Sequence, residues 1–279
     1  MISGIRRIFL SLAVQIVAVP AFAWGGWEHT VVAYIAQEHL TPRAESNLRY
    51  YLDQPLTEYA EWMDFVPLQG TPKYKPLIKD THMFTLNPDG TVPRESIVDN
   101  GECSASHMMN MMLDVVRDHR NQPDSLVVLY LRCLVHMFGD FHCPVHVLAH
   151  SAPGGFMPEG SWRNHYMFKK CFYEGKKVTM HNMWDTVLQR EKPEWTYEDW
   201  RLFLDTFDAG QRSEMTAGSF DDWLMESGSY AEEIYDLWQP GLHYDNTWYD
   251  GKITGLAHSQ IIKAAYRMAS YLNEVFDYE

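Results

Sequence analysis

Apolar residues recur every three or four positions along most of the chain, whereas the alternation typical of strands is scarce. Such spacing predicts helices with one apolar face, because residues three and four apart lie on the same side of a helix. No linker composition separates two halves. We therefore predict an all-α protein with a single mostly helical domain over residues 24–279. The segments with helical spacing are 27–40, 42–52, 56–63, 104–119, a long apolar stretch that starts at 124 or 125, 181–189, 198–205, 220–237 and 258–276.

Two long segments lack this spacing. Residues 67–100 are rich in proline, glycine and aspartate, and we expect mostly loop there. Residues 149–180 are also irregular, with a short hairpin predicted around Glu174-Gly175. Neither segment has a repeat or a low-complexity tract.

The first 23 residues read as a secretory signal peptide rather than as part of the fold. Arg6 and Arg7 precede an apolar run of about twelve residues, and Ala21-Phe22-Ala23 is a typical cleavage site. The run is too short to cross a bilayer, and no later segment reaches 18 apolar residues. We therefore predict cleavage before Trp24, a secreted or periplasmic protein and no stable membrane association.

The charge balance changes which partners are plausible. The net charge is −14, and removal of Arg6 and Arg7 with the signal peptide makes it −16. This negative net charge argues against a protein that binds nucleic acid through a broad basic surface. A nucleic-acid substrate would need positive charge from another source, such as bound metal.

One stretch, residues 134–146, concentrates candidate metal ligands. His136 and Asp140 are four apart and share one face of a helix. Pro144 ends that helix, so that His146 can turn back toward the same pocket. Imidazole and carboxylate form a ligand set suited to zinc. The alternative is a buried helix with satisfied polar groups, but burying this pair without a partner is costly.

The same spacing recurs at His181 and Asp185, which raises the probability of a metal centre. Asp64 ends a short helical piece, where it is alternatively a helix cap, and His82 is alternatively a half-buried loop histidine. The amino group and carbonyl of a new N-terminal Trp24 could chelate a metal together with His29. Five histidines, three aspartates and one terminus suit two or three zinc ions, and a pair of ions that shares an aspartate can activate water.

Four cysteines leave further alternatives open. Export permits disulfides, and Cys103, Cys133, Cys143 and Cys171 allow three full pairings. Because Cys133 and Cys143 flank the candidate metal stretch, thiolate ligation is a rival to the histidine and aspartate set.

Several motifs together resemble the zinc-dependent single-strand-specific nucleases of fungi and plants, which are sister to the bacterial zinc phospholipases C. The matching pieces follow the family order over essentially the whole mature chain: Trp24-Gly25 with His29, Trp62-Met63-Asp64, His82, His136 with Asp140 and His146, His181 with Asn182-Met183-Trp184-Asp185, and Arg267-Met268-Ala269 with Leu272-Asn273.

This resemblance implies a helical domain with three zinc ions in a cleft and a monomeric enzyme, although the sequence leaves the oligomeric state open. One ion would be bound by Asp64, His82, His136 and Asp140, its neighbour by Trp24, His29 and the bridging Asp140, and the third by His146, His181 and Asp185. The catalytic role of Asp140 is to bridge the paired ions that activate water. The family cleaves single-stranded RNA and DNA to 5′-phosphorylated products and removes 3′-phosphates from nucleotides.

The residues around the substrate match the family less well than the metal ligands do. Pro67 stands where an arginine is usual, and Thr85 where an aspartate is usual. Arg163 and Asn164 are candidates for contacts with phosphate or base. A zinc phosphodiesterase for phospholipid or another phosphodiester and a non-catalytic zinc-binding protein are the alternatives. Asp185 favours the nucleases, since the phospholipases carry glutamate there.

Overall fold

The computed structural model describes residues 24–64, 83–87, 89–93, 98–99, 102–103, 105–148, 170–237, 241, 243–245 and 253–279. The predicted signal peptide and most of the predicted loop at 67–100 lie outside the described residues. So do His82, Pro67, Arg163 and Asn164.

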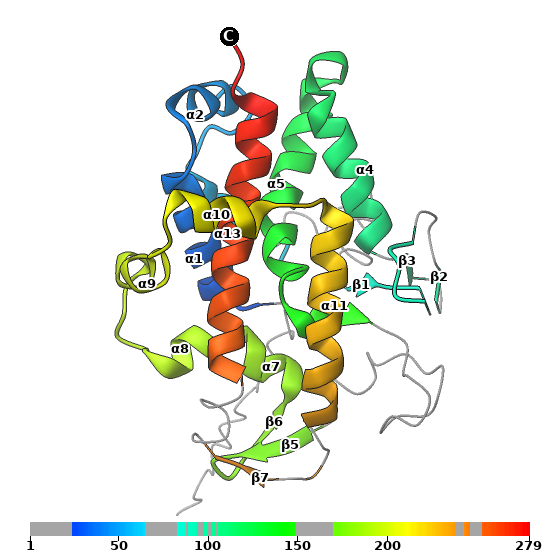
Figure 1. Cartoon of the computed structure of the whole chain (residues 1–279), viewed down its shortest axis with the longest axis vertical. Helices are drawn as coiled ribbons and strands as arrows, with labels where there is room; N and C mark the ends of the chain where they lie inside the picture. Colours follow the sequence, from blue (N-terminus) through cyan, green and yellow to red (C-terminus); the bar gives the residue numbers. More distant parts are fainter. Residues whose placement is uncertain are drawn as a thin grey trace, which may run out of the picture.

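Helices dominate this part of the chain (Figure 1), which confirms the predicted all-α class. They are α1 Gly26–Glu38, α2 Pro42–Leu48, α4 Ala105–Arg117, α5 Asp124–Asp140, α7 Met180–Asp185, α8 Val187–Glu191, α9 Tyr197–Leu204, α10 Ala209–Thr216, α11 Phe220–Leu237 and α13 Gly255–Phe276. No helix in the described ranges is both long enough and apolar enough to span a membrane.

The C-terminal helix α13 lies in the middle of the helical assembly. It packs against α1, α2, α5 and α10, and Figure 1 shows it beside α5 along the long axis of the molecule. Its apolar face, with Ile261, Ala265, Met268 and Leu272, is almost fully buried. Burial of each of the three larger side chains, Ile261, Met268 and Leu272, stabilises the fold by about 1.5–3 kcal/mol relative to exposure, so the amphipathic spacing in the sequence is what places α13 in the core.

Helix α5 ends where the candidate metal stretch begins to turn. After Asp140 the chain makes a turn and then a short 3-10 helix over Pro144–His146, as the position of Pro144 predicts. Strand β4 (Val147–Leu148) follows at once and pairs in parallel with β1 (Phe84–Thr85). This pairing brings the segment after His146 beside a segment more than sixty residues earlier in the chain.

A small sheet closes one end of the molecule (Figure 1). Strands β5 (Lys170–Tyr173) and β6 (Lys176–Thr179) form the predicted hairpin, and β7 (His243–Tyr244) adds a parallel edge. Glu174 and Gly175 occupy the turn with φ values of 48° and 74°, the left-handed conformation that a two-residue hairpin turn requires. Another short pair is formed by β2 (Val98–Asp99) and β3 (Glu102–Cys103).

The predicted elements differ from the observed ones at a few places. The segment predicted as one helix over 181–189 is two helices, because Thr186 has a φ of −125° and interrupts the helical backbone. The second predicted helix ends at Leu48 rather than at Leu52. Residues 56–63 form a 3-10 turn over Leu56–Tyr59 followed by turns. Helix α10 has no buried residue, so the spacing of apolar residues could not predict it.

Candidate metal centre

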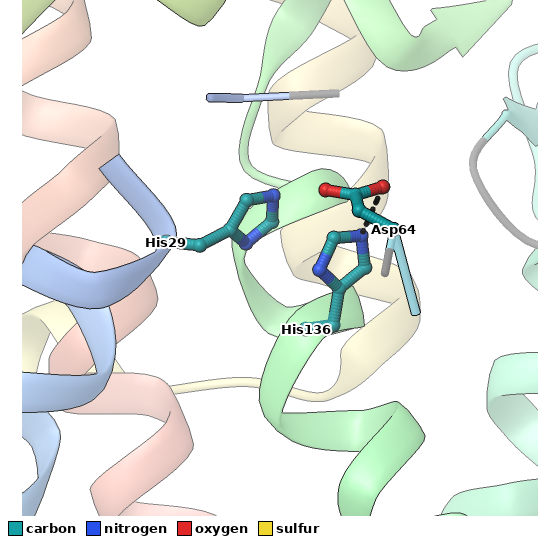
Figure 2. A group of neighbouring side chains, drawn as sticks. All are labelled: His29, Asp64 and His136. Carbon is teal, nitrogen blue, oxygen red and sulfur yellow. Dashed lines mark ion pairs between the residues drawn. The ribbon is translucent and has the colours of Figure 1, made fainter. Parts of the chain in front are cut away.

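Three candidate ligands from distant segments converge on one buried space. His29 lies in the first turn of α1, His136 in the last turns of α5, and Asp64 after the turn that follows Leu56–Tyr59. Figure 2 shows the two imidazoles and the carboxylate pointing toward one another. Nε2 of His136 lies 3.7 Å from Oδ1 of Asp64, and the two rings stack with their centroids 4.0 Å apart. One donor atom from each residue fits within 4.8 Å of the others.

A second group of the same composition forms from His146, His181 and Asp185. Nε2 of His146 lies 2.8 Å from Nε2 of His181, and Nδ1 of His181 lies 2.7 Å from Oδ2 of Asp185. The Thr179 hydroxyl caps α7 by accepting a hydrogen bond from the Asn182 backbone. This cap starts the helix at the register that puts His181 and Asp185 on one face.

Asp140 connects the two groups. Its Oδ1 lies 3.2 Å from Nε2 of His29 and its Oδ2 lies 3.1 Å from Nε2 of His136. Oδ1 is also 4.0 Å from Nδ1 of His146, a member of the second group. One carboxylate therefore faces both groups, and it is fully buried.

Two glycines permit the close approaches on which this geometry depends. A Cβ atom at Gly139 would overlap the ring of His29, so only glycine lets α1 and α5 approach at this point. A Cβ at Gly25 would overlap the carbonyl oxygen of Asp185, which accepts a hydrogen bond of 2.7 Å from the Gly25 N–H. Both positions adjoin candidate ligands.

Burial and proximity shift the ionisation of these groups in different directions. Burial opposes protonation of His136, but the carboxylates of Asp140 and Asp64 outweigh it and raise its pKa to about 10. Burial and the neighbouring His136 lower the pKa of His29. Burial raises the pKa of Asp185 to about 7, against the opposing influence of His181. Such opposed shifts in one buried cluster are typical of functional sites.

The donor set fits zinc. All seven residues are at most 5 % exposed, and their side chains offer imidazole nitrogens and carboxylate oxygens, the ligands that zinc takes in tetrahedral sites. Nδ1 of His136 lies 2.8 Å from the carbonyl oxygen of Ala60. The Nδ1–H donates to this carbonyl, so that Nε2 is the nitrogen that could bind a metal once its proton is displaced, the arrangement common to metal-binding histidines.

The structure thus brings together seven of the nine metal ligands expected from the sequence: His29, Asp64, His136, Asp140, His146, His181 and Asp185. Trp24 has a fully buried side chain and precedes Gly25, whose N–H donates to the Asp185 carbonyl oxygen. His82 lies outside the described residues. Thr85 is 7 % exposed in β1, and both its backbone N–H and its C=O bond to the Ser106 hydroxyl.

Within the described ranges, Cys133 and Cys143 belong to neither group. Cys133 and Cys143 are buried, and neither forms a disulfide, which excludes the three full pairings. Burial raises the pKa of the Cys133 thiol to about 12 and also raises that of Cys143, and a thiol that resists ionisation is a poor zinc ligand. The rival prediction of thiolate ligation by these two residues therefore lacks support in the geometry.

Sequence reasoning missed two buried polar groups around the centre. Glu28, next to His29, is fully buried, although a glutamate in the first turn of a helix is usually a solvent-exposed complement to the helix dipole. Burial raises its pKa well above the usual range. His142 is also fully buried, and its partner Arg267 at 3.0 Å carried no signal in the pattern beyond its position in a family motif.

Comparison with known proteins agrees with this geometry. The family model described as S1/P1 Nuclease matches residues 24–277. Nuclease S1 of Aspergillus oryzae is 25 % identical over 248 residues, which cover 85 % of this chain and 74 % of that protein. Nuclease PA3 of a Penicillium species and nuclease P1 of Penicillium citrinum are each 22 % identical over 290 residues, covering 90 % of this chain and 97 % of each relative. The match extends over nearly all of the chain after residue 23, and the protein belongs to the S1/P1 nuclease family.

Proposed function

We propose that the protein is a zinc-dependent endonuclease and 3′-nucleotidase that hydrolyses phosphodiester bonds of single-stranded RNA and DNA to 5′-phosphorylated products. The observation that carries this proposal is the position of Asp140 between two buried groups of histidine and aspartate, in a chain of the S1/P1 nuclease family. Three zinc ions would occupy the centre, two beside Asp140 and one at the second group.

The chain's own residues have distinct parts in this proposal. His29, Asp64 and His136, completed by His82 and the amino terminus of Trp24, would hold the paired ions, with Asp140 shared between them. His146, His181 and Asp185 would hold the third. Bound zinc would lower the pKa of a water molecule and neutralise phosphate charge. The protein supplies burial, which strengthens these electrostatic effects, and a fixed separation between the two groups.

The acidic surface is compatible with this substrate. With a net charge of −14, the protein has no general attraction for a polyanion, so that the affinity for phosphate would reside in the metal centre. We assign Arg163 and Asn164 to contacts with phosphate or base as part of the same proposal. A signal peptide over residues 1–23, export and a mature terminus at Trp24 complete it.

A phosphodiesterase for phospholipid or another phosphodiester is the competing function, and a non-catalytic zinc-binding protein is another. The deciding experiment uses protein that begins at Trp24, stripped of metal with a chelator and reloaded with zinc. Single-stranded DNA, RNA, 3′-AMP and phosphatidylcholine vesicles are offered in parallel. We expect zinc to restore cleavage of the nucleic acids and release of phosphate from 3′-AMP.

The outcomes separate the alternatives. Hydrolysis of phosphatidylcholine alone would assign the protein to the competing phosphodiesterase function. Tight zinc binding without hydrolysis of any substrate would leave only a zinc-binding role. A version that retains one residue before Trp24 tests the role of the amino terminus, and we expect a severe loss of activity from it.

A further inference from the structure

Glu28 lies at the junction between the segments that carry the two ligand groups. It is the third residue of α1 and directly precedes His29. Its side chain is fully buried, and its Oε1 accepts a hydrogen bond of 2.9 Å from the backbone N–H of Leu188, 160 residues away in the chain. Leu188 is the second residue of α8, which begins just after Asp185.

This contact gives the start of α8 a hydrogen-bond acceptor that the residues next to this helix do not provide. The N-cap residue Thr186 makes no side-chain hydrogen bond to the first turn of α8, and the first N–H groups of any helix lack partners within it. The Glu28 carboxylate takes that place from another helix, and the Gln189 N–H also stabilises it. Glu28, which lies on α1, therefore caps the start of α8 from a distant part of the same chain.

A second hydrogen bond connects the start of α1 with the end of α7. The Gly25 N–H donates to the carbonyl oxygen of Asp185 over 2.7 Å, and the second carboxylate oxygen of Glu28 lies 3.1 Å from the point where a Gly25 side chain would begin. Two hydrogen bonds thus tie the first turn of α1 to the junction of α7 and α8. His29 extends from one side of this connection and Asp185 from the other.

We propose that Glu28 is a positioning residue that fixes the separation of the two metal groups by holding the first turn of α1 against the α7–α8 junction. The proposal rests on the zinc centre of the proposed function. Glu28 lies outside both ligand groups, so it acts through His29 and Asp185 rather than as a ligand. A buried carboxylate is costly, yet Thr186, a residue type that caps helices well, stands at the N-cap of α8 and donates to the Asn182 carbonyl instead.

The test uses three substitutions in the full chain that begins at Trp24. Glu28→Ala removes the acceptor. Glu28→Asp keeps the charge but shortens the side chain by one methylene, which withdraws it from Leu188. Glu28→Gln keeps both the length and a carbonyl oxygen that can accept the Leu188 N–H. The control is Asn273→Ala, because Asn273 also bridges separate segments, accepting from the Thr41 N–H and donating to the His39 carbonyl, at the other end of α1.

The readouts are zinc per chain after dialysis against a weak chelator, zinc affinity, and the thermal midpoint with zinc and with EDTA. Ligand binding raises the midpoint in proportion to affinity. We expect Glu28→Ala and Glu28→Asp to weaken zinc binding by ~10-fold to ~100-fold, as losses of residues that orient ligands do. The difference between the thermal midpoints with zinc and with EDTA should become smaller in both variants. Glu28→Gln should stay close to the wild type. Asn273→Ala should lower both midpoints alike and keep its zinc.

The proposal is overturned if Glu28→Asp binds zinc as the wild type does, or if Asn273→Ala loses as much zinc as Glu28→Asp. It is also overturned if Glu28→Gln behaves like Glu28→Asp. Zinc binding would then not depend on the length of the residue 28 side chain or on its acceptor oxygen for the Leu188 N–H. Failure of the proposed function shows up separately, as a wild-type protein that neither holds zinc nor cleaves a nucleotide substrate.

Discussion

Nε2 of His29 lies 3.2 Å from Oδ1 of Asp140, and the other oxygen of the same carboxylate faces His136. Asp140 is thus within reach of a histidine from α1 and a histidine one turn earlier on α5, while Nδ1 of His146 lies 4.0 Å from the oxygen that faces His29. A substitution at Asp140 should therefore disturb both of the paired ions in the proposed centre, whereas a substitution at His146 should disturb chiefly the third ion.

The first prediction compares Asp140→Asn with His146→Ala. The amide keeps the size of the carboxylate but loses its charge and one acceptor oxygen, so we expect zinc affinity to fall by more than ~100-fold for the paired ions. Metal analysis should find two ions lost from Asp140→Asn and one lost from His146→Ala. Equal losses in the two variants would contradict a bridging position for Asp140.

The second prediction concerns Gly139. In a helix interior, alanine is more stabilising than glycine by about 1 kcal/mol. At this position, however, a Cβ atom would overlap the His29 ring. We expect Gly139→Ala to displace His29 and to reduce zinc retention, with a loss of about 1–3 kcal/mol in the free energy of unfolding from overpacking. Urea unfolding and metal analysis measure the two effects.

Gly255→Ala is the matched control, since Gly255 begins α13 and a Cβ there meets no atom within 4 Å. It should retain its zinc and be at least as stable as the wild type. Full zinc retention by Gly139→Ala would show that α1 and α5 can separate without loss of the centre.

The third prediction is a pH dependence of the metal-stripped protein. Burial raises the pKa of Asp185 to about 7, so the folded state holds a proton that the unfolded state releases above about pH 4. The pKa of His136 is raised to about 10 by Asp140 and Asp64; the stability that this provides is complete below about pH 6.5 and is lost as the pH rises toward 10. Both effects make stability fall with rising pH, whereas the lowered pKa values of His29 and His142 make it rise up to about pH 6.5. Above that pH the fall caused by His136 remains.

Urea unfolding in EDTA at pH 5, 7 and 9 measures this slope. Carboxyl groups with lowered pKa values, such as Asp53 and Asp118, lose their contribution only below about pH 4 and do not interfere. Zinc displaces the protons, so we expect the zinc-loaded protein to show a flatter dependence. Asp185→Asn should remove the part of the slope between pH 5 and 7. A stripped wild type that gains stability between pH 7 and 9 would contradict the raised pKa of His136.

The sequence could predict two of the side-chain contacts in the centre because their spacing is local. The pairs His136–Asp140 and His181–Asp185 are each four residues apart, so one helical turn brings each pair together, and the structure confirms both contacts. What a pattern could not predict is which separate segments meet. The contact of Glu28 with Leu188 depends on how α1 packs on α8, and nothing in the composition of either segment encodes it.

Helix boundaries show the same limit. The break at Thr186 separates α7 from α8 without a proline or glycine to mark it, and it is at this break that the Glu28 carboxylate replaces a local cap. The exposed helix α10 has no apolar stripe, but it carries a capping box formed by Asp208 and Gln211, a signal that the search for hydrophobic spacing passes over.

The last prediction concerns the brace on the turn after Asp140. His142 is fully buried and lies 2.8 Å from the Phe138 carbonyl through Nδ1 and 3.0 Å from Nη1 of Arg267 through Nε2. Because arginine can only donate, Nε2 is the acceptor, and Nδ1 carries the proton that is donated to Phe138. Arg267 also donates to the Glu226 carboxylate over 2.6 Å, so α13 and α11 together hold the end of α5.

Arg267→Met keeps much of the apolar volume but removes every donor. It leaves His142 without that donor, and Lys263 alone then neutralises Glu226. We expect a loss of about 1–3 kcal/mol in the free energy of unfolding, because the buried Nε2 of His142 loses its partner, while Glu226, whose side chain is 27 % exposed, keeps Lys263. Arg117→Met is the control, because Arg117 pairs with Asp114 and Glu274 while its side chain is 48 % exposed, and exposed pairs contribute at most about 1 kcal/mol. Urea unfolding that gives the two variants equal stabilities would rule out a bracing role for Arg267.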